Sequence, residues 1–104
     1  IPPPPPPSEL SLIGQDLEDA IDRTGNFLNW AFLGRLPEVL LTHEFASGPR
    51  RAAFERFLEQ HPHVKEISFE ESVFEQFVED HPHLKGIGFD GPEKIVLILA
   101  TVPD

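Results

Sequence analysis

A duplicated segment of sixteen residues is the feature that most constrains the fold of this chain. Residues 54–69 are FERFLEQHPHVKEISF and residues 74–89 are FEQFVEDHPHLKGIGF, so ten of the sixteen positions are identical. In each copy the first apolar residues have the spacing of one helix face, and a His-Pro pair ends the helix because the residue before proline avoids helical angles. The apolar residues that follow are spaced as in a short strand. We therefore expect two helix–turn–strand units in series, with parallel strands and a helix crossing between them.

The strand pattern of each unit, which follows a His-Pro-His turn, resembles that of leucine-rich repeats over residues 54–89. The resemblance implies that the strands of neighbouring units lie side by side. The chain departs from that family because no Asn or Cys follows the strand, and two units cannot bury the core of a solenoid by themselves. Two arrangements stay open: the units cap a longer array, or they sit inside a compact α/β fold.

The other segments predict an α/β fold, with α+β as the alternative. Apolar spacing predicts a helix over residues 8–24 and a second, short helix over residues 26–34, each stopped by a glycine. A strand over residues 39–42, for which a helix starting near Pro37 is the alternative, precedes a helix over residues 50–60. Residues 95–102 are apolar on both faces and predict a buried strand in a small mixed sheet. Residues 1–8 then form a polyproline tail or linker, and residues 9–104 form one domain that contains the duplication 54–69 and 74–89.

The chain is strongly acidic, with 18 Asp and Glu against 8 Lys and Arg, for a net charge of −10. Nucleic acid and anionic membranes are disfavoured as partners, because both require clustered basic residues. One stretch without Lys or Arg carries six acids: Glu66, Glu70, Glu71, Glu75, Glu79 and Asp80. These six residues are the candidate surface for a basic protein partner, as in an acidic inhibitor or immunity-like protein that masks such a partner. A solvated helix face is the other interpretation.

The two His-Pro-His turns carry His61, His63, His81 and His83. If the units stack at the ~5 Å spacing of neighbouring strands, the four imidazoles meet as a site for Zn, Cu or Ni, or as a group that charges near pH 6. Duplication of a helix-ending turn explains the same residues without a ligand. The sequence therefore assigns no metal and no cofactor, and a metal-sensing or pH-sensing domain stays an alternative.

The chain begins with a proline run that comprises Pro2, Pro3, Pro4, Pro5, Pro6 and Pro7. Such a run adopts the extended polyproline II form, which suits either a stiff linker or a ligand for the aromatic-lined groove of SH3, WW, EVH1 or profilin-type domains. The second interpretation would make the chain a scaffold or adaptor fragment. The apolar residues 27–33 are either core or a further docking surface.

No catalytic motif is present: the chain lacks Gly-x-Ser-x-Gly, a phosphate-binding glycine loop and His-Glu-x-x-His. The sequence therefore predicts a non-catalytic protein-interaction module and leaves its oligomeric state open. The absence of Cys excludes disulfides and favours a reducing compartment, so we expect a cytoplasmic protein. No apolar run approaches the ~20 residues of a membrane span. Because the chain contains no Met, we expect a processed product or a fragment.

Overall fold

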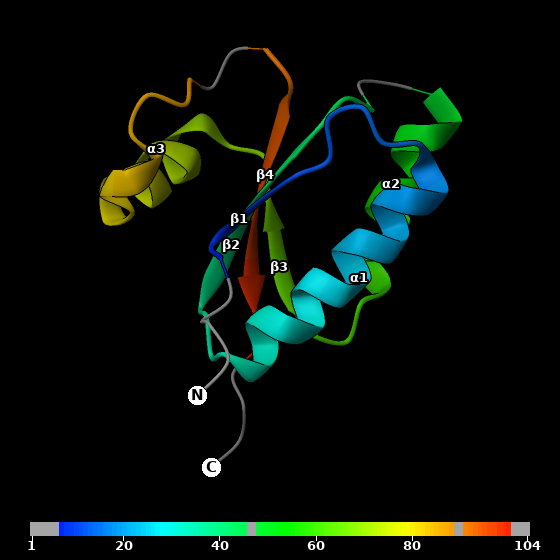
Figure 1. Cartoon of the computed structure of the whole chain (residues 1–104), viewed down its shortest axis with the longest axis horizontal. Coiled ribbons are helices and arrows are strands. Elements are labelled where there is room, and N and C mark those ends of the chain that lie inside the picture. Colours follow the sequence, from blue (N-terminus) through cyan, green and yellow to red (C-terminus); the bar gives the residue numbers. More distant parts are fainter. Residues whose placement is uncertain (1–6, 46–47, 89–90, 101–104) are drawn as a thin grey trace.

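The structure, a computed structural model, describes residues 7–45, 48–88 and 91–100. Three helices and four strands follow one another along the chain (Figure 1). In order they are β1 (Glu9–Ser11), α1 (Leu17–Leu33), β2 (Glu38–His43), α2 (Gly48–Gln60), β3 (Val64–Ser68), α3 (Glu71–Asp80), the short 3₁₀ helix η1 (Pro82–Leu84) and β4 (Glu93–Leu99). The predicted α/β class is confirmed.

The strands form one mixed sheet in the order β1-β2-β4-β3. β1 lies parallel to β2, whereas β4 pairs antiparallel with both β2 and β3. The last strand in the sequence is therefore a central strand, as its apolar character predicted. Its side chains alternate between the two faces of the sheet, and both faces are covered by helices.

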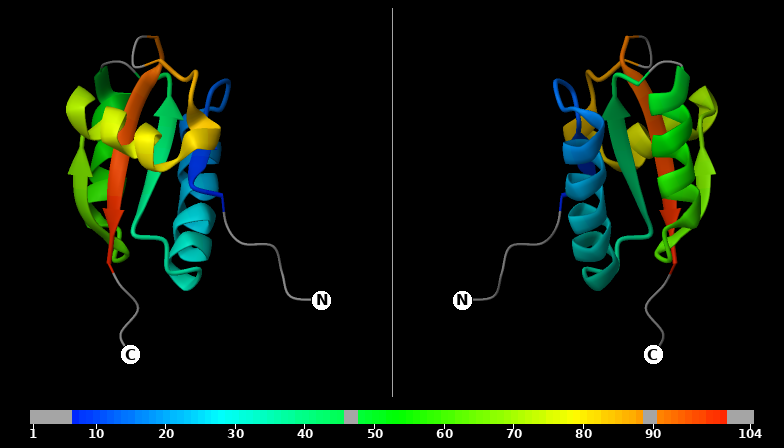
Figure 2. Two further views of the ribbon diagram at one scale, coloured as in Figure 1. Left: turned by 90° about the vertical axis from the view of Figure 1, so that its left-hand side faces the viewer. Right: turned by 90° about the vertical axis from the view of Figure 1, so that its right-hand side faces the viewer.

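The helices are divided between the two faces: α1 and α2 cover one face and α3 covers the other (Figure 2). Two separate apolar clusters result. The cluster under α1 and α2 includes Leu28, Val39, Leu41, Phe54, Leu58, Ile95 and Leu97. The smaller cluster under α3 consists of Leu40, Phe74, Phe77, Leu84 and Val96. Neighbouring residues of β2 and β4 belong to opposite clusters, as the two-residue period of a strand requires.

The predicted helix over residues 8–24 is wrong at both ends. Its first part is β1, and α1 starts after Asp16, whose carboxylate accepts a hydrogen bond from the backbone N–H of Asp19 at 2.8 Å. The helix continues through Gly25, so the separate helix predicted over residues 26–34 is its second half. Gly25 is tolerated because the apolar stripe continues past it; the stop comes at Gly34, whose N–H donates to the carbonyls of Phe32 and Trp30.

The two copies of the duplication fold differently after their helices. The first copy follows the prediction: helix α2 ends before His61, and β3 follows the turn. The second copy keeps helix α3 and the stop before His81, but the turn after it is the short helix η1, and no strand occurs within the described residues 84–88. Phe89 lies outside the described residues.

Strand pairing explains this difference. Both edges of β4 are already occupied, one by β2 and the other by β3, so the second copy has no central edge to join. Instead, Leu84 enters the apolar cluster under α3. The two units therefore do not place parallel strands side by side, as stacked leucine-rich repeats would. The strand predicted over residues 39–42 and the helix predicted over residues 50–60 are confirmed as β2 and α2.

Candidate functional site

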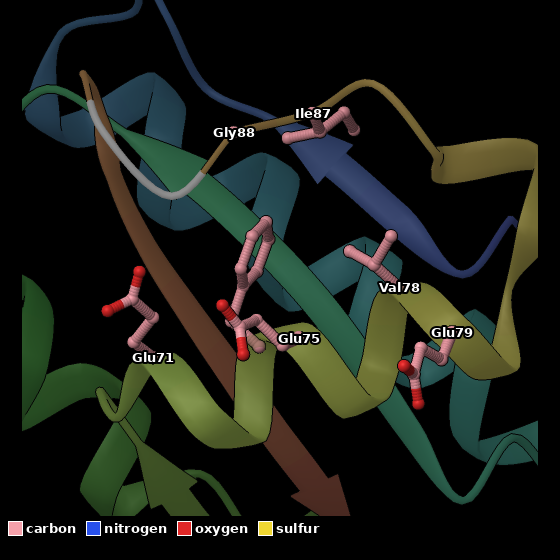
Figure 3. Close-up of a pocket in the computed structure, with 7 residues that line it drawn as sticks. Glu71, Glu75, Val78, Glu79, Ile87 and Gly88 are labelled. Carbon is pink, nitrogen blue, oxygen red and sulfur yellow. The ribbon is translucent and has the colours of Figure 1, made fainter.

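Three of the six predicted acidic residues border a pocket beside α3. Glu71, Glu75 and Glu79 recur every four residues, which places them on one side of the helix. The pocket has a volume of about 350 Å³, and its apolar lining comprises Phe74, Val78 and Ile87. Figure 3 shows Val78 pointing from α3 towards the segment that carries Ile87 and Gly88, with the three carboxylates along α3. An apolar pocket edged by three exposed carboxylates suits a ligand that is both apolar and positively charged.

The other three predicted acids do not line this pocket. Glu66 is exposed on β3 and lines a different pocket of about 290 Å³, near Phe69. Glu70 precedes α3, where its backbone N–H donates to the Ser68 hydroxyl at 3.4 Å. Asp80, at the end of α3, accepts a hydrogen bond from Gln76 at 3.3 Å. The pocket beside α3 is thus lined by three of the six acids, and Glu66 lines another pocket.

The carboxylates of this row are not neutralised within the described part of the chain. Among the described residues, no Lys, Arg or His lies within ion-pair distance of Glu71, Glu75 or Glu79. The helix α3 itself has no basic residue. Arg51, by contrast, pairs with two carboxylates near the starts of α2 and β4: Glu55 at 3.2 Å and Glu93 at 3.8 Å. The row therefore presents its full negative charge to solvent or to a partner.

The four histidines form two separate pairs. The rings of His61 and His63 are 5.3 Å apart, and those of His81 and His83 are 5.9 Å apart. The pairs follow α2 and α3, which cover opposite faces of the sheet. Among the described residues, no group of three or more His, Asp or Glu side chains could hold a metal ion. The expected cluster of four imidazoles is therefore not formed.

Each histidine pair has a local structural role. His63 stacks on Phe32 with ring centres 3.9 Å apart, which joins the turn after α2 to α1. His81 stacks on Phe77 at 4.1 Å, and its Nδ1 lies 2.8 Å from the carbonyl of the same residue. Burial, and secondarily the neighbouring His63, lowers the pKa of His61 below its usual 6.5. These contacts give the two His-Pro-His turns a structural role, the termination of α2 and α3, that requires no ligand.

One buried histidine was missed by sequence reasoning. His43, at the end of β2, is only 2% exposed, and its ring lies against Phe45 and Phe54. Its Nδ1 accepts a hydrogen bond from the backbone N–H of Phe45 at 3.0 Å. Burial is the main cause that lowers its pKa below 6.5. A single histidine after an apolar strand has no spacing signal, so only the tertiary structure reveals it.

A third pocket, of about 330 Å³, lies where the parallel strands β1 and β2 end. Ser11, Thr42 and the buried Lys94 contribute polar groups to it, and the Lys94 ammonium donates to the carbonyl of Pro92 at 2.9 Å. In open α/β sheets, ligands bind outside the carboxyl ends of parallel strands. This end of the sheet is therefore the second candidate site.

The remaining predicted surfaces are only partly described. Pro2 to Pro6 lie outside the described residues, and Pro7 is exposed. In the stretch 27–33, Phe27 and Leu28 are core residues, whereas Trp30 and Leu33 are exposed. The structure thus divides this stretch between core and surface. None of the described helices is long and apolar enough to cross a membrane.

Comparisons with known proteins give partial matches. The chain is similar to a protein named endonuclease MutS2, with 37% identity over 62 residues to that of Listeria innocua serovar 6a and 40% identity over 58 residues to that of Clostridium botulinum strain Loch Maree. These matches cover 60% and 56% of this chain, but only 8% and 7% of the relatives. The chain thus corresponds to a small part of these proteins. No protein-family model matches it.

Proposed function

We propose that this chain is a non-catalytic protein-binding domain that holds a basic partner on the acidic row of α3. The observation that carries the proposal is the arrangement of Glu71, Glu75 and Glu79 beside an apolar pocket. Apolar contact supplies affinity, and uncompensated charge supplies orientation and faster association. In its most concrete form, the domain masks a basic surface of its partner, as an inhibitor or immunity-like protein does.

A charge-matched pair of variants tests this function. In one, Glu71, Glu75 and Glu79 are replaced by Gln. In the other, the exposed acids Asp22, Glu44 and Glu59 are replaced by Asn, Gln and Gln. Both variants lose the same net charge, but only the first alters the row.

Binding is measured by calorimetry with a synthetic amphipathic peptide that carries Lys at four-residue spacing and Leu on the same side. We expect the peptide to bind the native chain and the control, and to bind the α3 variant much more weakly. Affinity should also fall between about 0.1 M and about 1 M salt, because the Debye length shrinks from about 10 Å to about 3 Å. An equal loss of affinity in both variants would show that peptide binding depends only on net charge, and the proposal would fail.

The similarity to endonuclease MutS2 favours a second candidate function, action on nucleic acid. An endonuclease cleaves nucleic acid, and a domain shared with one could bind the same substrate class. The corresponding site would be the carboxyl end of β1 and β2, next to the start of α2 with the exposed Arg50. The net charge of −10 opposes this function, because phosphate contacts require basic residues.

Labelled duplex and single-stranded DNA distinguish the two functions. If the second one holds, DNA binding should weaken in Arg50→Gln and should fall between about 50 and about 200 mM salt, but should be unaffected by the Gln replacements in α3. Incubation with Mg²⁺ and analysis of the strands on a gel tests cleavage directly. Peptide binding without DNA binding supports the first function alone.

A further inference from the structure

A row of three polar residues crosses three neighbouring strands of the sheet. Ser11 of β1 pairs with Thr42 of β2, and Thr42 pairs with Lys94 of β4. Paired residues of neighbouring strands point their side chains to the same face of a sheet. The three side chains therefore lie next to one another on one face, and we call them the Ser11–Thr42–Lys94 row.

The row lies on the face of the sheet that α3 covers. Thr42 is two residues from Leu40, and Lys94 is two residues from Val96. Leu40 and Val96 belong to the apolar cluster under α3, and residues two apart in a strand share a face. Arg50, the residue proposed above for contact with DNA, belongs to α2 on the opposite face (Figure 2). The row thus extends the second candidate site on the face away from Arg50.

The row lines the pocket of about 330 Å³ at the carboxyl ends of β1 and β2. Pockets that bind small molecules have volumes of about 300–1,000 Å³, so this one suits a small ligand. Ile13, from the segment after β1, and Ile87 supply apolar side chains to it. Figure 3 shows Ile87 beside the end of β1. Glu9 also lines the pocket and adds a carboxylate, since it precedes Ser11 by two residues and shares its face.

The pocket carries one positive and one negative side chain. Lys94 is only 7% exposed, and its ammonium donates to the carbonyl of Pro92 at 2.9 Å. An ammonium group has three N–H donors, so it can hold more than one acceptor. Its low exposure strengthens its attraction for an anion, because water screens the charge less. Glu9 is half-buried and attracts a cation. A ligand with a single charge would meet a like charge in this pocket, whereas a ligand with both charges is attracted at both ends.

We propose that this pocket binds a monomeric α-amino acid with an apolar side chain. The ligand carboxylate accepts hydrogen bonds from the Lys94 ammonium and from the two hydroxyls of the row, and the ligand ammonium pairs with Glu9. In the register of the sheet, Glu9 and Lys94 are two strands and two positions apart, so their Cα atoms are separated by roughly 12 Å. Two long side chains and one small ligand can fill that gap. The apolar side chain of the ligand then contacts Ile13 and Ile87.

Titration of the full chain with L-leucine, followed by NMR chemical shifts, tests this inference. Leucine should bind, and two analogues that each lack one charge should bind about tenfold more weakly or worse: leucinamide, which has no carboxylate, and N-acetylleucine, which has no ammonium. Glycine should also bind more weakly, because it has no apolar side chain. No shift with leucine at millimolar concentration, or equal affinity for leucinamide, would overturn the proposal.

Two charge variants locate the site, and each has a matched control. Lys94→Met and Glu9→Gln should each weaken leucine binding about tenfold. Lys65→Met and Glu18→Gln remove the same charges at exposed positions that do not line the pocket, and they should leave leucine binding unchanged. Equal losses of affinity in a variant and its control would overturn the proposal. Circular dichroism verifies each fold, and Glu9→Gln keeps the test decisive if the buried Lys94→Met does not fold.

The result is independent of the acidic row of α3. Leucine binding should be unchanged by the Gln replacements in α3, and binding of the basic peptide should be unchanged by Glu9→Gln. Loss of leucine binding in the α3 variant would place the ligand in the pocket beside α3 instead, and would also overturn the proposal.

Discussion

Thr24 provides a sharp test of the core, because its replacement should stabilise the protein. Thr24 lies in α1 and is fully buried, and among the described residues its hydroxyl oxygen is the buried side-chain atom without a hydrogen-bond partner. It lies on the same helix face as Ala20, Phe27 and Leu28, which pack against the sheet. The hydroxyl has therefore lost its water without gaining a partner.

The magnitude follows from the cost of burying an unpaired hydroxyl. Protein mutational data put this cost at about 1–3 kcal/mol. Valine has nearly the same shape as threonine and a similar helix propensity, so Thr24→Val removes the hydroxyl without leaving a cavity. We expect the free energy of unfolding to rise by about 1 kcal/mol, which corresponds to about 4–8 °C in melting temperature for a domain of this size.

Urea unfolding followed by circular dichroism measures the effect. The midpoint should rise while the slope stays constant, because the surface exposed on unfolding does not change. Thr24→Ser is the matched control: it keeps the hydroxyl and removes the methyl group, and it should destabilise the protein. If Thr24→Val is less stable than the native chain, the hydroxyl has a partner in solution, and the reasoning is refuted.

Three further predictions concern other parts of the fold. Burial lowers the pKa of His43, so as the pH falls below about 6.5 the unfolded chain gains a proton that the folded chain resists, and the free energy of unfolding should fall; melting curves for His43→Gln with the same pH dependence would contradict this. Asp16→Ala removes the N-cap bond to Asp19 and should cost about 1 kcal/mol in urea unfolding, and no change would show the cap to be dispensable. Phe54→Ala should cost about 3–5 kcal/mol by the same measurement, against less than about 1 kcal/mol for the exposed Phe69→Ala, and similar losses would place Phe54 outside the core.

Local patterns predicted the elements whose environment is decided by their own residues. β4 was predicted as a central strand because its residues are apolar on both faces, and only a strand with neighbours on both edges and helices on both faces buries them all. The ends of α2 and α3 were predicted because the proline after His61 and His81 acts on its immediate neighbour. Neither inference needs knowledge of the rest of the fold.

Patterns failed where a distant segment decides the outcome. Gly25 is a plausible helix stop by itself, but α1 continues because the residues after it, among them Phe27 and Leu28, are needed to cover the sheet. The candidate site was likewise predictable from the sequence only in part. The four-residue spacing of Glu71, Glu75 and Glu79 is visible in the sequence, whereas Ile87, which lines the pocket, reaches it only through the turn after α3.

The duplication shows how one pattern can serve two faces of a sheet. α2 buries Phe54 with Val39, Leu41, Ile95 and Leu97 on one face, whereas α3 buries Phe74 with Leu40 and Val96 on the other. Both copies can do this because adjacent residues of β2 and β4 are apolar and point in opposite directions.

The same geometry separates the polar parts of the two copies. Only the first copy can add a strand to β4, since β2 occupies the other edge, so the histidine turns and the acids of the two helices end on opposite sides of the sheet. A function that needs both copies in one site is therefore disfavoured. The acidic row of α3 lies beside the pocket of its own copy, so the proposed binding site depends on the second copy alone.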